Sequence, residues 1–287
     1  MMSLRVAVAH AEVMITTCGQ TVLAKEVGVL QQDLACPVAP GTAGVCISGG
    51  APCVDDVDCQ AFAQTCIHPA GVILESLATL RLGGFSLSDG DVGIDCHGAG
   101  TRGCQIEGPG EIRTARLYGI LVQQGGRYRI TQLSLDGNRL GIGSLGVAAP
   151  EVKRLMMTLA DLTIANSTSF GILLGPPIHA SVKGTDITLT DNGSFGILVN
   201  NFISANPSPR RDARAKFTRL LATGNSSLGI YADQLTLIDS ALATSPLGAT
   251  DIWSFRKPHL RNSTCNKSVR MIDGVGGSGT WGVCAAD

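Results

Sequence analysis

A Gly-Ile dipeptide followed by an alternating apolar segment recurs along the chain and constrains its fold more than any other feature. The repeat isoleucines lie 22 to 33 residues apart: Ile94, Ile120, Ile142, Ile172, Ile197, Ile230 and, in a further copy, Ile252. Shorter alternating segments, such as Leu133–Leu135 and Leu162–Ile164, lie between them. Alternation indicates half-buried strands, and a period of this length without a helical pattern predicts a solenoid of parallel strands.

The composition fits stacked coils. Sharp corners need glycine, of which there are 36 in 287 residues, and a narrow interior leaves room for only 4% aromatic residues. The 44% hydrophobic content excludes a disordered chain, and the net charge of −1 argues against nucleic acid as a partner. The sequence has no apolar run of roughly 18 residues, so we expect no membrane span.

A polar residue precedes most repeat isoleucines by four to six positions, at Asp89, Asn138, Asn166, Asn192 and Asn225. Asparagine tolerates the left-handed backbone of a tight corner, and stacked amides can bond from coil to coil. We therefore predict a structural asparagine ladder in preference to a catalytic or glycan-bearing role.

The ten cysteines fall into three groups: Cys18, Cys36, Cys46, Cys53, Cys59 and Cys66 near the N-terminus, Cys96 and Cys104 together, and Cys265 and Cys284 at the C-terminus. An even number in clusters predicts disulfides and a secreted or periplasmic protein. A zinc site in the run from Cys46 to Cys66 is the alternative, but gaps of five or six residues differ from CxxC-type knuckles. We expect a disulfide-rich N-terminal cap over 1–70, a solenoid over 71–260 and a disulfide-closed C-terminal cap over 261–287.

The Gly-Ile strands, the segments Leu162–Asn166 and Ile187–Asn192 and the polar corner resemble the right-handed parallel β-helix superfamily, which has the pectate-lyase-like fold. The ends, with Cys18–Thr21 and Trp281–Cys284, are similar to those of secreted bacterial β-helix repeat proteins. The resemblance implies an all-β, right-handed parallel β-helix solenoid with a disulfide-stapled N-terminal cap. It also implies the activities found in that superfamily, which are polysaccharide lyases, polygalacturonases, epimerases, phage-tail depolymerases and adhesins.

The acids and histidine that polygalacturonase-like members carry just before the repeat are missing. Apolar residues stand at those places: Val92, Tyr118, Leu140, Phe170, Phe195 and Leu228. Because glycoside hydrolysis needs paired carboxylates, a catalytic site would lie elsewhere. We expect Phe170 and Phe195 to stack as packing residues.

A polar column offers the most lyase-like grouping. We expect Gln132, Asp161, Asp186, Arg219 and Gln234 to point outward on successive coils, beside a column of Ser134, Thr163, Thr188 and Thr236. Neighbouring carboxylates repel, which raises the pKa of one of them or recruits a divalent cation such as calcium. Asp161, Asp186 and Arg219 are thus the candidate catalytic residues, and a solvated column with one ordinary ion pair is the alternative.

Asp95 and His97 share one face of a strand whose Cys96 should point inward to meet Cys104. They form a candidate base or metal half-site, with a capping turn as the alternative. His68, His179 and His259 have no evident partner in the sequence.

The longest repeat interval contains a predicted loop over 206–216, rich in arginine. Its cations are candidate ligands for a carboxylated or sulfated polymer: Arg210, Arg211, Arg214 and Lys216.

The residues that follow the repeat isoleucines form an apolar column, which includes Leu121, Leu173, Leu198, Tyr231 and Trp253. We expect the N-terminal or insertion segments to cover it. A sugar-stacking groove that uses Tyr231 and Trp253, or a self-association surface, is the alternative.

These features predict an extracellular protein that binds an acidic polysaccharide on its lateral face, with lyase or hydrolase cleavage as the further expectation. A non-catalytic adhesive or glycan-binding module is the alternative. Metal-assisted hydrolysis of an unrelated ester by Asp95 and His97 is a weaker one. The residues do not choose among lyase, hydrolase and epimerase.

Overall fold

A computed structural model describes residues 11–46, 51–55, 58–59, 66–98, 102–123, 125–145, 154–175, 180–199, 213–243, 250–271 and 279–287. Within these ranges the chain forms 24 strands: β1 Glu12–Ile15, β2 Gln20–Val22, β3 Val27–Leu30, β4 Leu34–Ala35, β5 Gly44–Cys46, β6 Pro52–Cys53, β7 Cys66–Ile67, β8 Val72–Leu74, β9 Thr79–Arg81, β10 Ser86–His97, β11 Gln105–Gln123, β12 Gly126–Asp136, β13 Leu140–Leu145, β14 Leu155–Ala165, β15 Phe170–Leu174, β16 Ala180–Thr190, β17 Phe195–Val199, β18 Arg214–Thr223, β19 Leu228–Ala232, β20 Gln234–Ile238, β21 Ala241–Ala243, β22 Thr250–Ser254, β23 His259–Arg261 and β24 Ser268–Arg270.

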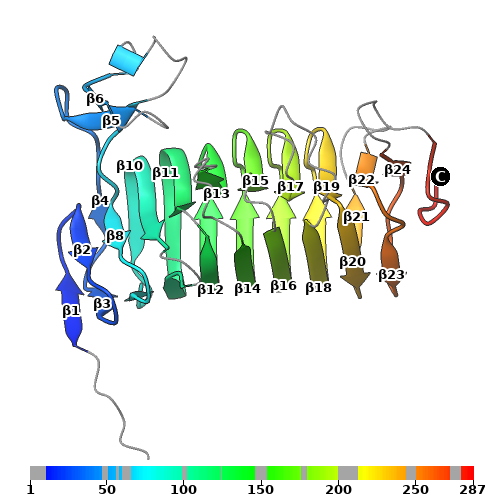
Figure 1. Cartoon of the computed structure of the whole chain (residues 1–287), viewed down its shortest axis with the longest axis horizontal. Helices are drawn as coiled ribbons and strands as arrows, with labels where there is room; N and C mark the ends of the chain where they lie inside the picture. The colour runs from blue at the N-terminus through cyan, green and yellow to red at the C-terminus, as the bar shows by residue number, and fades with distance from the viewer. Residues whose placement is uncertain are drawn as a thin grey trace, which may run out of the picture.

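The strands wind into the parallel solenoid that the repeat predicts, and it is the right-handed β-helix that the resemblance implies. One wall runs through β12, β14, β16 and β18, and another through β13, β15, β17 and β19, with parallel pairing from each coil to the next. Figure 1 shows the coils stacked in chain order from β1 to β24. Parallel pairing also extends on both sides of 71–260, since β1 pairs with β3 and β22 pairs with β24.

The repeat isoleucines stack in one line inside the solenoid. Each pairs in register with the next, from Ile94 through to Ile252. All seven are fully buried, so the interior wall is a column of identical side chains, and the predicted repeat is confirmed at every copy.

The asparagine ladder is confirmed at Asn138, Asn192 and Asn225, which are fully buried. Asn192 donates from its Nδ2 to Oδ1 of Asn225 at 2.9 Å, and its own Oδ1 accepts the backbone N–H of Ser167 at 3.2 Å. Ser167 therefore occupies the ladder position that the sequence pattern assigned to Asn166.

The prediction was wrong for Asn166 and Asp89. Both lie one residue earlier than the ladder, at exposed corners with left-handed φ angles of 53° and 56°. Their side chains bond exposed neighbours, Asp136 and Thr114 respectively. Two adjacent corner positions both favour short polar residues, one for its backbone angle and one for its buried amide, and spacing alone did not separate them.

Five disulfides confirm the cysteine prediction: Cys18–Cys36, Cys46–Cys59, Cys53–Cys66, Cys96–Cys104 and Cys265–Cys284. Two of them hold a small antiparallel sheet of β5, β6 and β7, which we call the knot. It projects from the N-terminal end of the solenoid (Figure 1). Among the described residues no helix is long and apolar enough to cross a membrane.

Candidate functional site

The candidate catalytic residues lie at a bend where each long strand turns from one wall to the next. Asp161, Asp186 and Arg219 have φ angles of 54°, 56° and 55°, and the pairs that flank them place them on successive coils. Aspartate tolerates this left-handed conformation, so the bend itself favours Asp161 and Asp186. Arginine and glutamine have no such preference, which makes Arg219 and Gln132, at φ 58° on the coil before that of Asp161, the unusual residues of the column.

The next member of this column is Asp239, and the expectation of Gln234 was wrong. Gln234 pairs with Arg214, whereas Thr218 pairs with Ile238 and brings Asp239 beside Arg219. For the same reason Thr236 pairs with Lys216, and Leu221 rather than Thr236 follows Thr188. The short strands β20 and β21 together replace one long strand. Leu235 and Leu237 of β20 therefore lie in the wall that precedes the bend, although they resemble the apolar pairs that follow it.

Arg219 and Asp186 form a bidentate pair on the surface. The Nε and Nη2 groups donate to the two carboxylate oxygens at 2.5 Å each. These hydrogen bonds from Arg219 lower the pKa of Asp186, and the same contact raises the pKa of Arg219. Repulsion was expected to raise the pKa of one of the two aspartates, and Asp186 is not that one, because its bonds to Arg219 lower its pKa.

A hollow of about 480 Å³ lies beside this pair, towards the C-terminal end. It is lined by Arg219, Asp239, Asn262 and Thr264, with the half-exposed Leu221 among its apolar residues. Asn262 donates to Oδ1 of Asp239 at 3.1 Å. The hollow combines a cation, a carboxylate, an amide and a hydroxyl group, which suits a ligand rich in hydroxyl groups.

Cations cover the outward side of the neighbouring wall, a pattern that the sequence analysis did not recognise. They are exposed residues of β12, β16 and β18: Arg127, Arg129, Lys183, Arg214 and Lys216. We call this set the cationic face. Their rows are defined by strand pairing, with Arg129, Thr158, Lys183 and Lys216 in one row and Arg127, Met156, Ser181 and Arg214 in the other. Neither row contains a carboxylate between β12 and β18.

Two of the predicted ligand-binding cations thus lie in a strand. Arg214 and Lys216 belong to β18, so the expectation of a loop that reaches Lys216 was wrong. Arg210 and Arg211 lie outside the described residues. A per-strand view of outward positions would have found the cationic face, since Arg129, Lys183 and Lys216 each precede a bend residue by three positions.

The apolar column is covered at both ends, by the N-terminal region as expected and, at the other end, by residues near the C-terminus that the expectation did not include. Leu121 is 1% exposed and packs with Ala70 and Ile67 of the N-terminal region. Tyr231 is 3% exposed and packs with Met271, and Trp253 is half-buried beside it. Tyr231 therefore offers little surface to a sugar ring.

In the middle of this wall Phe170 and Phe195 stack with ring centroids 5.2 Å apart, as predicted. Self-association through Leu121, Leu173, Leu198 and Tyr231 stays a prediction.

Asp95 and His97 do lie together, and Cys96 between them bonds inward to Cys104. Nε2 of His97 lies 3.1 Å from Oδ2 of Asp95, and Gln123 donates to both oxygens of that carboxylate at 2.8 and 2.7 Å. The hydrogen bond to Asp95 raises the pKa of His97. Glu75 approaches the other ring nitrogen at 3.7 Å. Asp95 and Glu75 lie beside opposite nitrogens of the His97 ring, so the two carboxylates do not converge on a single metal position. The metal role of Asp95 and His97 stays a prediction.

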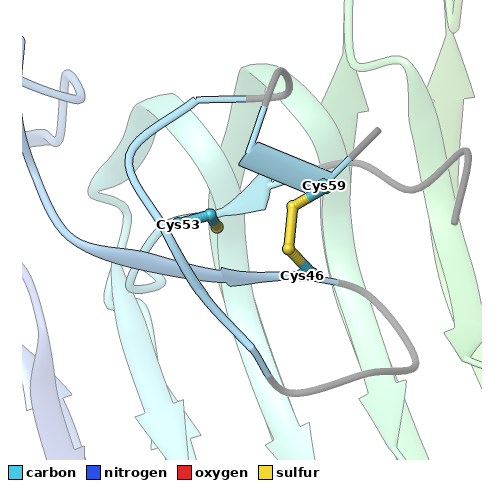
Figure 2. Close-up of side chains that lie close together, drawn as sticks. All are labelled: Cys46, Cys53 and Cys59. Carbon is cyan, nitrogen blue, oxygen red and sulfur yellow. A yellow bond between two sulfur atoms is a disulfide. The ribbon is translucent and has the colours of Figure 1, made fainter. Parts of the chain in front are cut away.

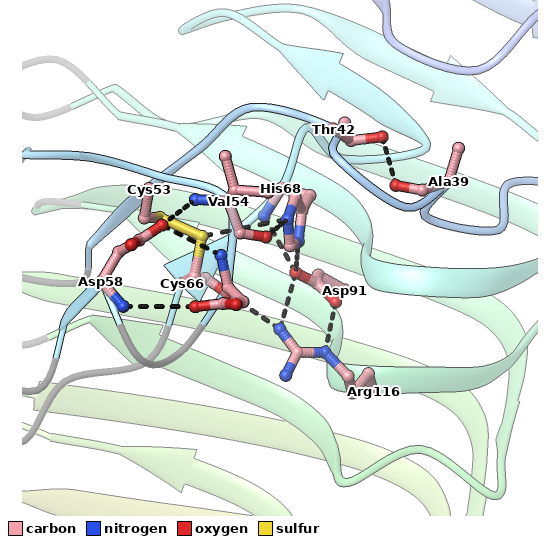
Figure 3. A network of polar contacts seen from close by, with 10 residues as sticks. Ala39, Thr42, Cys53, Val54, Asp58, Cys66, His68, Asp91 and Arg116 are labelled. Atoms are coloured by element: carbon pink, nitrogen blue, oxygen red, sulfur yellow. Dashed lines mark hydrogen bonds and ion pairs between the residues drawn. A yellow bond between two sulfur atoms is a disulfide. The ribbon is translucent and has the colours of Figure 1, made fainter.

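A buried charge network joins the knot to the solenoid (Figure 3), and no local sequence pattern predicts it. His68 follows β7, and its Nδ1 lies 2.6 Å from Oδ2 of Asp91, which is 1% exposed. Arg116 donates to both oxygens of Asp91 at 2.6 and 2.9 Å, and to the carbonyl of Cys66 at 2.8 Å. Burial alone would raise the pKa of Asp91, but the bonds from Arg116 and His68 outweigh it and lower that pKa. The network therefore serves to anchor the knot.

The sulfur atoms of Cys46, Cys53 and Cys59 form the one group among the described residues with metal-like spacing. Figure 2 shows Cys46 bonded to Cys59, and Cys53 is bonded to Cys66. Because a thiolate is needed to hold zinc, these disulfides leave no ligand, and the alternative of a zinc site is wrong.

Fold and site together define a right-handed parallel β-helix protein with a polar bend column beside a cationic face. No family model matches the sequence, and no curated protein matches it significantly. Among solved structures, pectate lyase Pel9A matches with 12% identity and a TM-score of 0.36, over 86% of this chain and 72% of that one. A variant of the periplasmic alginate epimerase AlgG matches with 10% identity and a TM-score of 0.32, over 84% of this chain and 61% of that one. Scores this low carry no argument about substrate or activity.

Proposed function

We propose that this protein is an extracellular module that binds an acidic polysaccharide along the cationic face. The observation that carries the proposal is the uniform sign of charge on that face. Three of four consecutive strands, β12, β16 and β18, present Arg or Lys outward, and no acid shares their rows. Arg127, Arg129, Lys183 and Lys216 make no ion pair with any described residue, so their donors are available to a ligand.

The remaining features support an extracellular setting and a polymeric ligand. Five disulfides require an oxidising compartment. The cationic face is a wall of in-register strands that continues from coil to coil, and such a surface suits an extended chain better than a small molecule. The net charge of −1 means that this attraction is local, so long-range binding of any polyanion is not expected.

Binding is tested by charge removal. The variant R129Q/K183Q/K216Q should lose affinity for a polyuronate by at least tenfold at 50 mM salt, and the wild-type affinity should fall more steeply with salt than that of the variant. The matched control is R81Q/R113Q, which removes two exposed arginines that already have acidic neighbours. Equal affinity of wild type and triple variant would refute the proposal, as would tighter binding of DNA than of polyuronate.

Cleavage of the bound chain is a second candidate function, favoured by the position of Asp161. This carboxylate makes no hydrogen bond or ion pair with a described residue, and the Asp186–Arg219 pair and its hollow lie on the next coils. In β-elimination Asp161 would accept the C5 proton beside a uronate carboxylate, which Arg219 would contact. The C4–C5 double bond would form as the bond from C4 to the leaving sugar oxygen breaks, and that oxygen would take a proton from water. A divalent cation such as calcium could reinforce Arg219.

The test follows the unsaturated product of β-elimination on uronate polymers, with and without calcium. Activity that is lost in D161N and retained in R81Q supports the site. Activity that survives in both D161N and D186N would remove these residues from the catalytic role. If no turnover occurs but polyuronate binds, the protein is a non-catalytic glycan-binding or adhesive module.

A further inference from the structure

The cationic face is interrupted, and the interruption has a regular place in the row. Arg129 on β12 and Lys183 on β16 are exposed cations, and between them β14 presents Thr158. In the parallel row β14 presents Met156, which is 36% exposed. The nearest cation of that strand, Arg154, lies before its first residue. The strand in the middle of the face is therefore neutral along both rows.

From this pattern we infer that the protein selects an acidic polysaccharide whose charged sugars are separated by neutral ones, and that this chain lies along the solenoid axis. The inference rests on the proposed function and names its ligand class. Strands in a sheet are about 4.8 Å apart, so Arg129 and Lys183 are separated by about 10 Å. This exceeds the Debye length of about 8 Å at physiological salt. The two cations therefore act as separate binding points and not as one diffuse charge.

The neutral strand discriminates against a uniformly charged chain. A sugar residue advances a polysaccharide by a distance similar to one strand spacing, so a chain with every sugar charged places an anion over β14. That anion would lose water against the Met156 side chain and gain no cation, which is unfavourable. A neutral sugar at the same place gains a hydroxyl contact from Thr158 and an apolar contact from Met156. Lys216, next to Lys183 in the row, strengthens the second binding point.

The orientation follows from the same residues. The row Arg129, Thr158 and Lys183 crosses from strand to strand, so it runs in the direction of the solenoid axis. Along β14 itself the outward residues in this region are Met156, Thr158 and Ala160, which bear no charge. A chain laid along a strand would therefore meet cations on some strands and none on β14, whereas a chain laid along the axis always meets both binding points.

The test compares two polymers at 0.15 M salt, one with a carboxylate on every sugar and one with a single carboxylate per disaccharide. Wild-type protein should bind the second at least threefold more tightly per unit length. The variant T158K fills the gap in the row, so it should shift the ratio of affinities towards the uniformly charged polymer by about threefold or more, the scale of an exposed ion pair. The control T158Q has a similar length without charge and should leave the ratio unchanged.

The outcomes separate the two claims. Binding of the uniformly charged polymer as tightly as the alternating one by wild type, or an unchanged ratio in T158K, overturns the inference and leaves the proposed function standing. Failure of wild type to bind either polymer overturns both. Thermal unfolding of T158K and T158Q at the wild-type midpoint confirms that the exposed substitution leaves the fold intact.

Discussion

Two arginine–aspartate pairs among the described residues have the same geometry in different surroundings. Arg116 and Asp91 lie where the knot meets the solenoid, and Asp91 is 1% exposed. Arg219 and Asp186 lie at the lateral bend, with side chains 55% and 41% exposed. In both pairs the guanidinium makes two bonds to the carboxylate and lowers its pKa. Geometry alone therefore does not distinguish a structural pair from a functional one.

Burial and additional partners make the difference. Asp91 also accepts bonds from the backbone and ring of His68, so every oxygen of its carboxylate is used inside the protein. Asp186 has solvent beside it, and its partner Arg219 borders the hollow near Asp239. The buried pair holds two regions together, while the exposed pair remains accessible to a ligand.

The largest effect is expected from Asp91→Asn. Removal of one member of a buried pair leaves the other charge without compensation, and because Arg116 is itself half-exposed we expect a loss of about 2–4 kcal/mol in unfolding free energy. Urea denaturation at neutral pH measures it. A loss no larger than that of Asp186→Asn would contradict the comparison.

The same variant has a pH signature. Because the pKa of Asp91 is lowered in the folded protein, its stabilisation is present above about pH 3.9 and is lost as pH falls through the lower folded-state pKa. Wild type should thus lose more stability than Asp91→Asn on acidification through this range. Parallel curves for the two proteins would show that the carboxylate is not ionised in the network.

A smaller effect is expected from Asn192→Ala in the buried ladder. The change removes the acceptor of the Ser167 N–H and the donor to Asn225, and unsatisfied buried groups cost about 1–3 kcal/mol. Asn166→Ala, one coil away and exposed, is the matched control. Equal losses for the two variants would mean that the ladder adds nothing beyond the corner conformation.

His97 should give a weaker, pH-dependent effect. Its pKa is raised by Asp95, so the stability that it adds is full below about pH 6.5 and is lost as pH rises through the higher folded-state pKa. His97→Gln should flatten the dependence of the unfolding midpoint on pH above 6.5. An unchanged slope would exclude the His97–Asp95 contact as its source.

The smallest effect on stability is expected from Asp186→Asn. Both members of its pair are exposed, and exposed pairs contribute little to folding. The thermal midpoint should stay at the wild-type value, whereas the affinity for an acidic oligosaccharide should change because Arg219 loses its partner. Marked destabilisation would assign this pair to the structural class of Asp91 and Arg116.

The regular parts of the fold were predictable, because the repeated Gly-Ile dipeptide indicates which residues pair between coils, as Ile142 does with Ile172. The proposed binding surface was harder to predict. Arg129 and Lys183 are 54 residues apart in sequence, yet only one strand separates them, so their proximity depends on the length of each coil. His68, Asp91 and Arg116 meet across different elements with no local pattern. Gln234 was misplaced because a coil built from two short strands repeats the apolar signal of a longer one.

The most direct test of the central claim is a titration of wild type and of the charge-reversed variant R129E/K183E/K216E with an acidic polysaccharide that carries one carboxylate per disaccharide. The account predicts saturable, salt-sensitive binding by wild type and none by the variant, with both proteins folded to the same thermal midpoint. Equal binding by the two proteins would show that the cationic face is not the ligand site.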